Sequence, residues 1–308
     1  MPVVVTGAAG FIGSHLTEFL LGAGYRVTGI DRRPIAAREG LTGITADLLD
    51  NDSGLIRALR HADAVFHLAG RPGVRDRSPE AEKWRRQDNV LATAAVLERV
   101  PLSVPLVVTS SSSVYGGTRD GGASHEDDPL RPRGGYAASK AEVEQLCTRR
   151  LCAGGRVAVC RPFTVAGENQ RADMALAQWI SAVAEDRPVR ILGSAGRTRD
   201  VSDVRDVARA MTVLAERGFC GTVNIGTGTG HTLASLVAAV GRALSREPRV
   251  QSAPAPHDDP PHTRADTSRL AAITGWVPKT DLEALVERQV ASCKRAFKGY
   301  SQASAFPP

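Results

Sequence analysis

Tyr136 and Lys140 are spaced so that they could act together in proton transfer. On a helix, residues four apart lie on one face, so the Lys140 ammonium can lie beside the Tyr136 phenol. A free tyrosine has a pKa of about 10, and a nearby cation favours the phenolate and lowers that pKa. The pair therefore predicts a general base that works near neutral pH.

A run of hydroxyl side chains, TSSSSVYG at residues 109–116, follows a predicted strand. Ligands of open parallel sheets bind at the carboxyl ends of the strands. A hydroxyl in this run can bridge a substrate alcohol and Tyr136, and we expect Ser111 to have that role. The residues alone leave open a serine-rich turn without a ligand.

Three glycines follow the first predicted strand in the sequence GAAGFIG at residues 7–13. Gly7 allows a tight turn, Gly10 lets the backbone approach a pyrophosphate, and Gly13 permits close packing of helix on strand. The N-terminus of the following helix offers N–H groups and a positive dipole end to phosphates. The pattern predicts dinucleotide binding, with glycines that serve only turns as the alternative.

Asp31 ends the second predicted strand, near the offset of about 20 residues that such glycine loops require. A carboxylate there accepts hydrogen bonds from the adenosine ribose and repels a 2′-phosphate, so NAD is favoured over NADP. Arg32 and Arg33 follow directly and could bind such a phosphate, which keeps NADP open.

The motifs lie in a regular alternation of strands and helices. Short β-branched runs predict strands at Val3–Thr6, Arg26–Ile30, Ala64–His67, Leu106–Thr109 and Val157–Cys160. Helical patterns lie between them at Ser14–Leu21, Leu55–Leu59, Asn89–Val100 and Ala137–Leu151. This alternation predicts an α/β fold, a Rossmann-type doubly wound parallel sheet with a smaller C-terminal substrate-binding α/β domain.

Composition narrows the class of protein. The chain has 308 residues, 42% of them hydrophobic, and no stretch approaches about 20 uninterrupted apolar residues, so we expect neither a membrane span nor a signal peptide. The five cysteines lie far apart without a CxxC pair, which predicts free thiols, no metal site and a cytoplasmic location. A formal net charge of +6 suits an anionic nucleotide, while scattered arginines with few aromatics argue against nucleic acid.

Over nearly its whole length the chain resembles an extended short-chain dehydrogenase/reductase of the NAD-dependent sugar epimerase/dehydratase family. Further matching segments are ADL at 46–48, HLAG at 67–70, Asn89 before a helix, RD at 199–200 and ADTS at 265–268. The resemblance implies that Lys140 also anchors the nicotinamide ribose and that His67 is structural. The predicted cofactor-binding residues are Gly7, Gly10, Phe11, Ile12, Gly13, Asp31, Arg32, Asp47, Leu48, Leu68, Ala69, Gly70, Asn89, Ser110, Tyr136, Lys140 and Pro162.

The hydroxyl run separates subgroups of this family. By resemblance, 4,6-dehydratases carry Asp-Glu where this chain has Ser112 and Ser113, and UDP-glucuronate decarboxylases keep a glutamate at the second position. Without either acid, the chain can oxidise and re-reduce a sugar C4 but is poorly equipped for elimination. This favours an epimerase.

Two further segments resemble those of UDP-glucuronate 4-epimerases: RPFTVAG at 161–167 followed by RADMA at 171–175, and GVR at 73–75. The resemblance implies that Thr164 and the serines bind the C6 carboxylate while Arg171 fixes the sugar. Solvated surface arginines are the alternative for Arg75 and Arg171. The predicted substrate-binding residues are Arg75, Ser111, Ser112, Ser113, Tyr136, Thr164, Arg171, Arg199 and Asp259, with Arg199 on the diphosphate and Asp259 on the ribose.

We therefore expect a UDP-glucuronate 4-epimerase that retains NAD, with Tyr136, Lys140 and Ser111 as catalytic residues. The alternatives are another UDP-sugar 4-epimerase, a UDP-glucuronate decarboxylase and a non-catalytic NAD-binding protein. Residues 1–161, with 206–228 returning, are expected to bind NAD; 162–205 and 229–298 would bind the nucleotide sugar, and 299–308 would form a disordered tail. Relatives imply a homodimer through the helices near 89–100 and 137–151.

Overall fold

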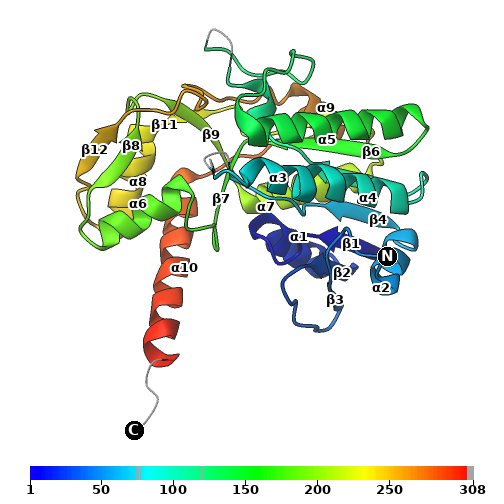
Figure 1. Ribbon diagram of the computed structural model, residues 1–308. Helices are drawn as coiled ribbons and strands as arrows, with labels where there is room; N and C mark the ends of the chain where they lie inside the picture. Colours follow the sequence, from blue (N-terminus) through cyan, green and yellow to red (C-terminus); the bar gives the residue numbers. More distant parts are fainter. Residues whose placement is uncertain (74–75, 77, 119–120, 304–308) are drawn as a thin grey trace.

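Within the described residues, a seven-stranded parallel sheet forms the centre of the molecule (Figure 1). The computed structural model describes residues 1–73, 76, 78–118 and 121–303. The strand order is β10-β6-β5-β4-β1-β2-β3, and all neighbouring pairs are parallel. The strands are β1 (Pro2–Thr6), β2 (Arg26–Asp31), β3 (Leu41–Thr45), β4 (Ala64–His67), β5 (Leu106–Thr109), β6 (Val157–Pro162) and β10 (Gly221–Ile225).

The strand order reverses between β1 and β4, which is where ligands bind in open α/β sheets. The chain runs outward from β1 through β2 to β3, then returns to β4 on the other side of β1. The glycine loop after β1 and the HLAG segment after β4 therefore lie side by side, with Thr6 in register with His67. The predicted doubly wound sheet is confirmed.

Helices cover both faces of this sheet because their apolar stripes pack onto its Val-, Ile- and Leu-rich strands. One face carries α1 (Phe11–Gly22), α7 (Val204–Glu216) and α9 (Ser268–Thr274). The other carries α2 (Ser53–Arg60), α4 (Ala92–Arg99) and α5 (Gly134–Cys152), with α3 (Ala81–Arg85) and the π-helical segment Arg86–Leu91 leading into α4. Figure 1 shows α4 and α5 side by side; a homodimer through these two helices stays a prediction.

A smaller unit lies beside the carboxyl ends of the central strands, on the left in Figure 1. Its strands form the sheets β11-β9-β7 and β12-β8. Helices α6, α8 and α10 pack around a separate apolar core that contains Trp179, Val237 and Leu285. The elements are β7 (Thr164–Ala166), α6 (Ala175–Ala184), β8 (Val189–Leu192), β9 (Thr198–Asp203), β11 (Gly230–Thr232), α8 (Leu233–Leu244), β12 (Val250–Ala253) and α10 (Leu282–Ala303).

The predicted strands and helices occur within a few residues of their expected bounds, and two further strands, β3 and β10, join the central sheet. Helix α10 continues to Ala303, into the segment expected to be a disordered tail. No helix among the described residues has the length and apolar character needed to cross a bilayer.

A buried ion pair fixes the carboxyl end of β6 to the middle of α5. Arg161 donates from Nε and Nη2 to the two carboxylate oxygens of Glu144, at 2.9 and 2.6 Å, and both side chains are less than 10% exposed. Arg161 Nη1 donates to the Tyr115 hydroxyl at 2.8 Å, and that hydroxyl donates to Asn224 Oδ1 on β10 at 2.7 Å. The Arg161 guanidinium on β6 thus contacts α5 and the 3₁₀ helix Ser112–Tyr115, and through Tyr115 it is linked to β10.

We predict that Glu144→Ala destabilises the fold by about 3–5 kcal/mol, because it leaves the Arg161 charge buried without its partner. Urea unfolding monitored by circular dichroism measures this. Glu185→Ala is the matched control, since Glu185 pairs with Arg187 on the surface and its loss should change the midpoint little. Equal midpoints for the two variants would contradict the importance assigned to the pair.

Candidate active site

The glycine loop is packed so closely against backbone atoms that it has no room for side chains at its three glycines. Gly7 has φ +72°, and a Cβ added there would lie 2.7 Å from the Ala69 backbone nitrogen. A Cβ at Gly13 would lie 2.0 Å from the Gly7 carbonyl oxygen, and one at Gly10 would lie 2.9 Å from the same oxygen. The bare turn keeps the N-terminus of α1 close to the carboxyl end of β1, as dinucleotide binding requires.

Asp31 lies against this loop, and the two following arginines are engaged. Its Oδ2 accepts from the Ala9 backbone N–H at 3.0 Å, and its Oδ1 from that of Arg33 at 2.9 Å. Arg32 donates to both carboxylate oxygens of Asp88, at 3.2 and 3.0 Å, and lies 3.6 Å from Asp47 Oδ2. Arg33 Nη2 donates to the Ala9 carbonyl oxygen, and its Nε lies 3.6 Å from Asp31 Oδ1. Because both arginines have partners within the protein, the surroundings of Asp31 favour NAD over a cofactor with a 2′-phosphate.

Asn89 joins the segment after β4 to helix α5. Its Oδ1 accepts from the Arg71 backbone N–H at 2.7 Å, and its Nδ2 donates to Ser139 Oγ at 2.9 Å. A Cβ at Gly70 would lie 2.7 Å from Asn89 Oδ1, which explains the glycine there. The π-helical turn directs this amide, 1% exposed, away from solvent.

His67 has a structural position, as expected. Its ring bridges the hydroxyls of Thr6 and Thr93, at 2.7 and 2.9 Å, in the core below the site. Burial lowers the pKa of His67 to about 3, so the ring is neutral.

Tyr136 and Lys140 lie on adjacent turns of α5, and their surroundings differ from each other. Lys140 Nζ donates to the Thr109 carbonyl oxygen at 2.8 Å, and burial lowers the pKa of Lys140 to about 8. Burial raises the pKa of Tyr136, while a hydrogen bond with Ser111 and the positive charge of Arg171 lower it. The role of Lys140 in keeping Tyr136 acidic stays a prediction.

The hydroxyls of the serine run have separate environments. Ser110 Oγ donates inward to Glu144 Oε1 at 2.5 Å, so a contact of Ser110 with a cofactor is left to its backbone. Ser111 caps the short 3₁₀ helix Ser112–Tyr115 by accepting from the Ser113 N–H at 3.1 Å. Ser113 Oγ is buried and has no hydrogen-bond partner among the described residues. In this run, the Ser111 hydroxyl is hydrogen-bonded to Tyr136, and the Ser113 hydroxyl has no partner among the described residues.

Thr164 and Arg171 come from the crossover between the two units. Thr164 begins β7, directly after β6, and pairs in register with Val201 of β9. Arg171 donates to Asp173 from Nε and Nη2, each at 2.9 Å, and both side chains are exposed, so the alternative of a surface arginine stays open. Arg75, the other arginine predicted near the sugar, lies outside the described residues.

Arg199 and Asp259, predicted to bind the diphosphate and the ribose, contact each other, and a third residue joins them. Arg199 Nη2 donates to Asp259 Oδ1 at 2.9 Å, and Arg197 Nη2 donates to Asp259 Oδ2 at 2.9 Å. The carboxylate predicted to contact a ribose is therefore shared between two arginines. Sequence reasoning missed Arg197, although its i, i+2 spacing from Arg199 at a strand was a usable signal.

The other residues predicted to bind the cofactor lie at the following positions in the fold. Leu48 is buried, and Asp47 Oδ1 accepts from the Leu49 N–H at 2.9 Å. Phe11 and Ile12 begin α1 and pack against the core, Leu68 N–H donates to the Thr6 carbonyl oxygen at 3.1 Å, and Pro162 ends β6. Their roles toward a cofactor stay predictions.

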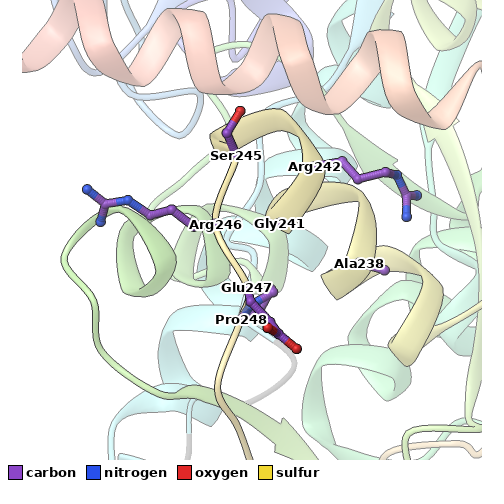
Figure 2. Close-up of a pocket in the computed structure, with 7 residues that line it drawn as sticks. All are labelled: Ala238, Gly241, Arg242, Ser245, Arg246, Glu247 and Pro248. Atoms are coloured by element: carbon purple, nitrogen blue, oxygen red, sulfur yellow. The ribbon is translucent and has the colours of Figure 1, made fainter.

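A separate pocket of about 440 Å³ lies at the end of α8 in the smaller unit (Figure 2). Figure 2 shows Arg242 and Arg246 pointing to opposite sides of the helix end. Arg242 pairs with Glu283 of α10, and Arg246 donates to the carbonyl oxygens of Val183 and Ala184 at the end of α6. These arginines hold helices together, and the pocket contains none of the predicted site residues.

Comparison with known proteins agrees with this geometry. The model of the NAD dependent epimerase/dehydratase family matches residues 3–226. The uncharacterized UDP-glucose epimerase YtcB of Bacillus subtilis (strain 168) is 30% identical over 97% of this chain and 100% of its own.

Two solved structures superpose closely. MoeE5 in complex with UDP-glucuronic acid and NAD is 34% identical with a TM-score of 0.86, covering 96% of this chain and 100% of its own. The UDP-glucuronic acid 4-epimerase of Bacillus cereus in complex with UDP-glucuronic acid and NAD is 29% identical with a TM-score of 0.88, with the same coverage. Because the family match spans most of the chain and the turn after β1 has the geometry of a dinucleotide site, the chain belongs to the NAD dependent epimerase/dehydratase family and uses NAD.

Proposed function

We propose that this protein is a UDP-glucuronate 4-epimerase, which interconverts UDP-glucuronate and UDP-galacturonate with a retained NAD. The observation that carries the proposal is the Tyr136 and Lys140 pair on α5, with Lys140 on the Thr109 carbonyl oxygen, beside a hydroxyl run that has serine and no acid at positions 112 and 113. C6 of a glucuronate is bonded to C5, next to the C4 at which Tyr136 would act. Arg171, whose positive charge lowers the pKa of Tyr136, would bind the C6 carboxylate of the substrate.

The described residues fit NAD at the reversal of the sheet. The glycine turn leaves the N-terminus of α1 open to a pyrophosphate, and Asp31 offers its carboxylate beside that turn. Lys140, on the face of α5 that carries Tyr136, would anchor the nicotinamide ribose. When bound, NAD supplies reversible hydride transfer at C4 of the sugar.

Tyr136 would act as the base for the 4-hydroxyl. Its phenolate takes the O4 proton as the C4 hydride leaves, and the phenol returns that proton when the hydride comes back to the opposite face of C4. Ser111, already hydrogen-bonded to Tyr136, would hold O4 in line. The redox change cancels over the cycle, so NAD is not consumed.

The hydroxyls and Arg171 would also protect the intermediate. Oxidation at C4 makes a β-keto acid, which loses CO2 readily when its carboxylate stands perpendicular to the carbonyl plane. The Ser113 hydroxyl, which has no partner among the described residues, the Thr164 hydroxyl and the Nη1 donors of Arg171 that Asp173 does not use could hold the carboxylate out of that alignment. Positions 112 and 113 also lack the acids of dehydratases and decarboxylases.

We predict that purified protein converts UDP-glucuronate to UDP-galacturonate without added NAD, followed by proton NMR of the sugar signals. Tyr136→Phe should lower the rate by about 10²–10⁴-fold, because the base is removed. Tyr25→Phe is the control, since its hydroxyl contacts Glu216, outside the site. Formation of UDP-xylose and CO2 would show a decarboxylase instead, and turnover of UDP-glucose alone would show a different UDP-sugar epimerase. A fully active Tyr136→Phe variant would contradict the mechanism.

We predict that Asp31→Ala weakens NAD binding by about tenfold to a hundredfold, since a charged hydrogen bond contributes about 1.5–3 kcal/mol. Binding of NADP should be no weaker, because the repulsion of its 2′-phosphate is lost. Arg32→Ala serves as the matched variant: Arg32 is committed to Asp88, so its removal should leave the weak affinity for NADP unchanged. Titration of cofactor-free protein measures each affinity, and NADP preference in the wild type would refute the assignment.

We predict that Arg171→Ala moves the acidic limb of the kcat/KM profile for UDP-glucuronate to higher pH. The positive charge lowers the pKa of Tyr136, so without it the phenolate forms only at higher pH. Arg171→Lys keeps the charge but loses the fork, so its limb should stay in place while KM rises. An unshifted limb in Arg171→Ala would show that Arg171 does not act on the base.

A further inference from the structure

The Asp259 carboxylate accepts hydrogen bonds from two arginine side chains. Arg197 and Arg199 donate to different oxygens of its carboxylate, both at 2.9 Å, and Arg197 Nη2 also donates to the Asp259 backbone oxygen at 2.5 Å. The three side chains are only 13%, 14% and 18% exposed. Two cations share one anion, so the group, called here the arginine clamp, carries a formal charge of +1.

The arginine clamp borders the site described above. Arg199 lies two residues before Val201 on β9 and therefore on the same face of that strand, and the register partner of Val201 is Thr164; Arg197 directly precedes β9. The segment that carries Asp259 runs past the N-terminal end of α5: a Cβ at Gly134 would lie 3.1 Å from Asp258 Oδ2. Gly134 is two residues before Tyr136, which places the clamp at the edge of the same site.

The Arg197 side chain is mostly buried, and not all of its N–H donors have a partner within the part of the chain that the structure describes. Gly193, at φ +82°, makes room for it, since a Cβ there would lie 2.8 Å from Arg197 Cδ. Only Nη2 of Arg197 contacts Asp259, and its buried Nε has no hydrogen-bond partner among the described residues. A mostly buried guanidinium with unfilled donors indicates an anionic ligand, since an arginine cannot lose its charge.

We infer that Arg197 is a second diphosphate-binding residue beside Arg199, and that Asp259 is a positioning residue for the pair. This rests on the proposed function for the presence of a nucleoside diphosphate. The carboxylate keeps two like charges close enough to face both phosphates, which repulsion would otherwise separate. In this role Asp259 acts through the arginines, each of which occupies one of its oxygens, and not through the ribose.

The test compares UDP, titrated by calorimetry, with uridine, followed by ligand-observed NMR, on the NAD-loaded protein. Arg197→Ala should weaken UDP binding by about tenfold or more, reduce its salt dependence and leave uridine binding unchanged. Asp259→Asn should do the same, and the double variant should lose no more than the sum of the two. Arg187→Ala, a surface arginine paired with Glu185, is the control.

The inference fails if Arg197→Ala binds UDP like the wild type, or if it loses UDP and uridine equally, as a purely structural arginine would. Loss of uridine binding in Asp259→Asn would restore the ribose contact and overturn the positioning role. These outcomes are independent of turnover: wild-type protein that binds UDP but leaves UDP-glucuronate unchanged refutes the proposed epimerase and not the arginine clamp.

Discussion

The buried pair of Arg161 and Glu144 is the constraint on which the site depends. Burying two charges is favourable only when every donor and acceptor is used, and here all three guanidinium nitrogens have partners. The pair fixes α5, which carries Tyr136, against β6, from which the chain passes directly to Thr164. It also holds Ser110 at the start of the hydroxyl run. The candidate base, hydroxyl run and crossover therefore have one common anchor.

A second buried carboxylate connects the smaller unit to the sheet. Asp200 of β9 is fully buried and accepts four hydrogen bonds: from the backbone and hydroxyl of Thr227, and from the backbone N–H groups of Gly228 and Ala265. The loop after β10 is thereby tied to the strand that carries Arg199. Together the two carboxylates set the separation between the sheet that would bind NAD and the arginines that would bind a diphosphate.

The local parts of this arrangement could be predicted from sequence, and the distant contacts could not. Glycine spacing after β1 and the i, i+4 pair on α5 are set within one turn or helix, so their types and spacing suffice. The partner of Arg32 is Asp88 and that of Arg197 is Asp259, and no spacing rule connects residues so far apart in the chain. The positive charge of Arg171, which lowers the pKa of Tyr136, also comes from a residue distant in the chain that no spacing rule indicates. Strand β3 was missed because its half-exposed sequence, LTGIT, lacks a continuous apolar run.

The arginines of this basic chain differ in how many of their N–H donors are hydrogen-bonded within the protein. That difference separates structural from ligand-binding roles. Arg161 uses Nε and both terminal nitrogens within the protein, so nothing is left for a ligand. Arg171 spends Nε and Nη2 on Asp173, and Arg197 spends only Nη2 on Asp259. A carboxylate partner removes the rotational freedom of a long side chain before a ligand arrives, while the fork keeps donors to offer. Partial pairing thus orients a guanidinium for an anion, whereas full pairing converts it into part of the frame.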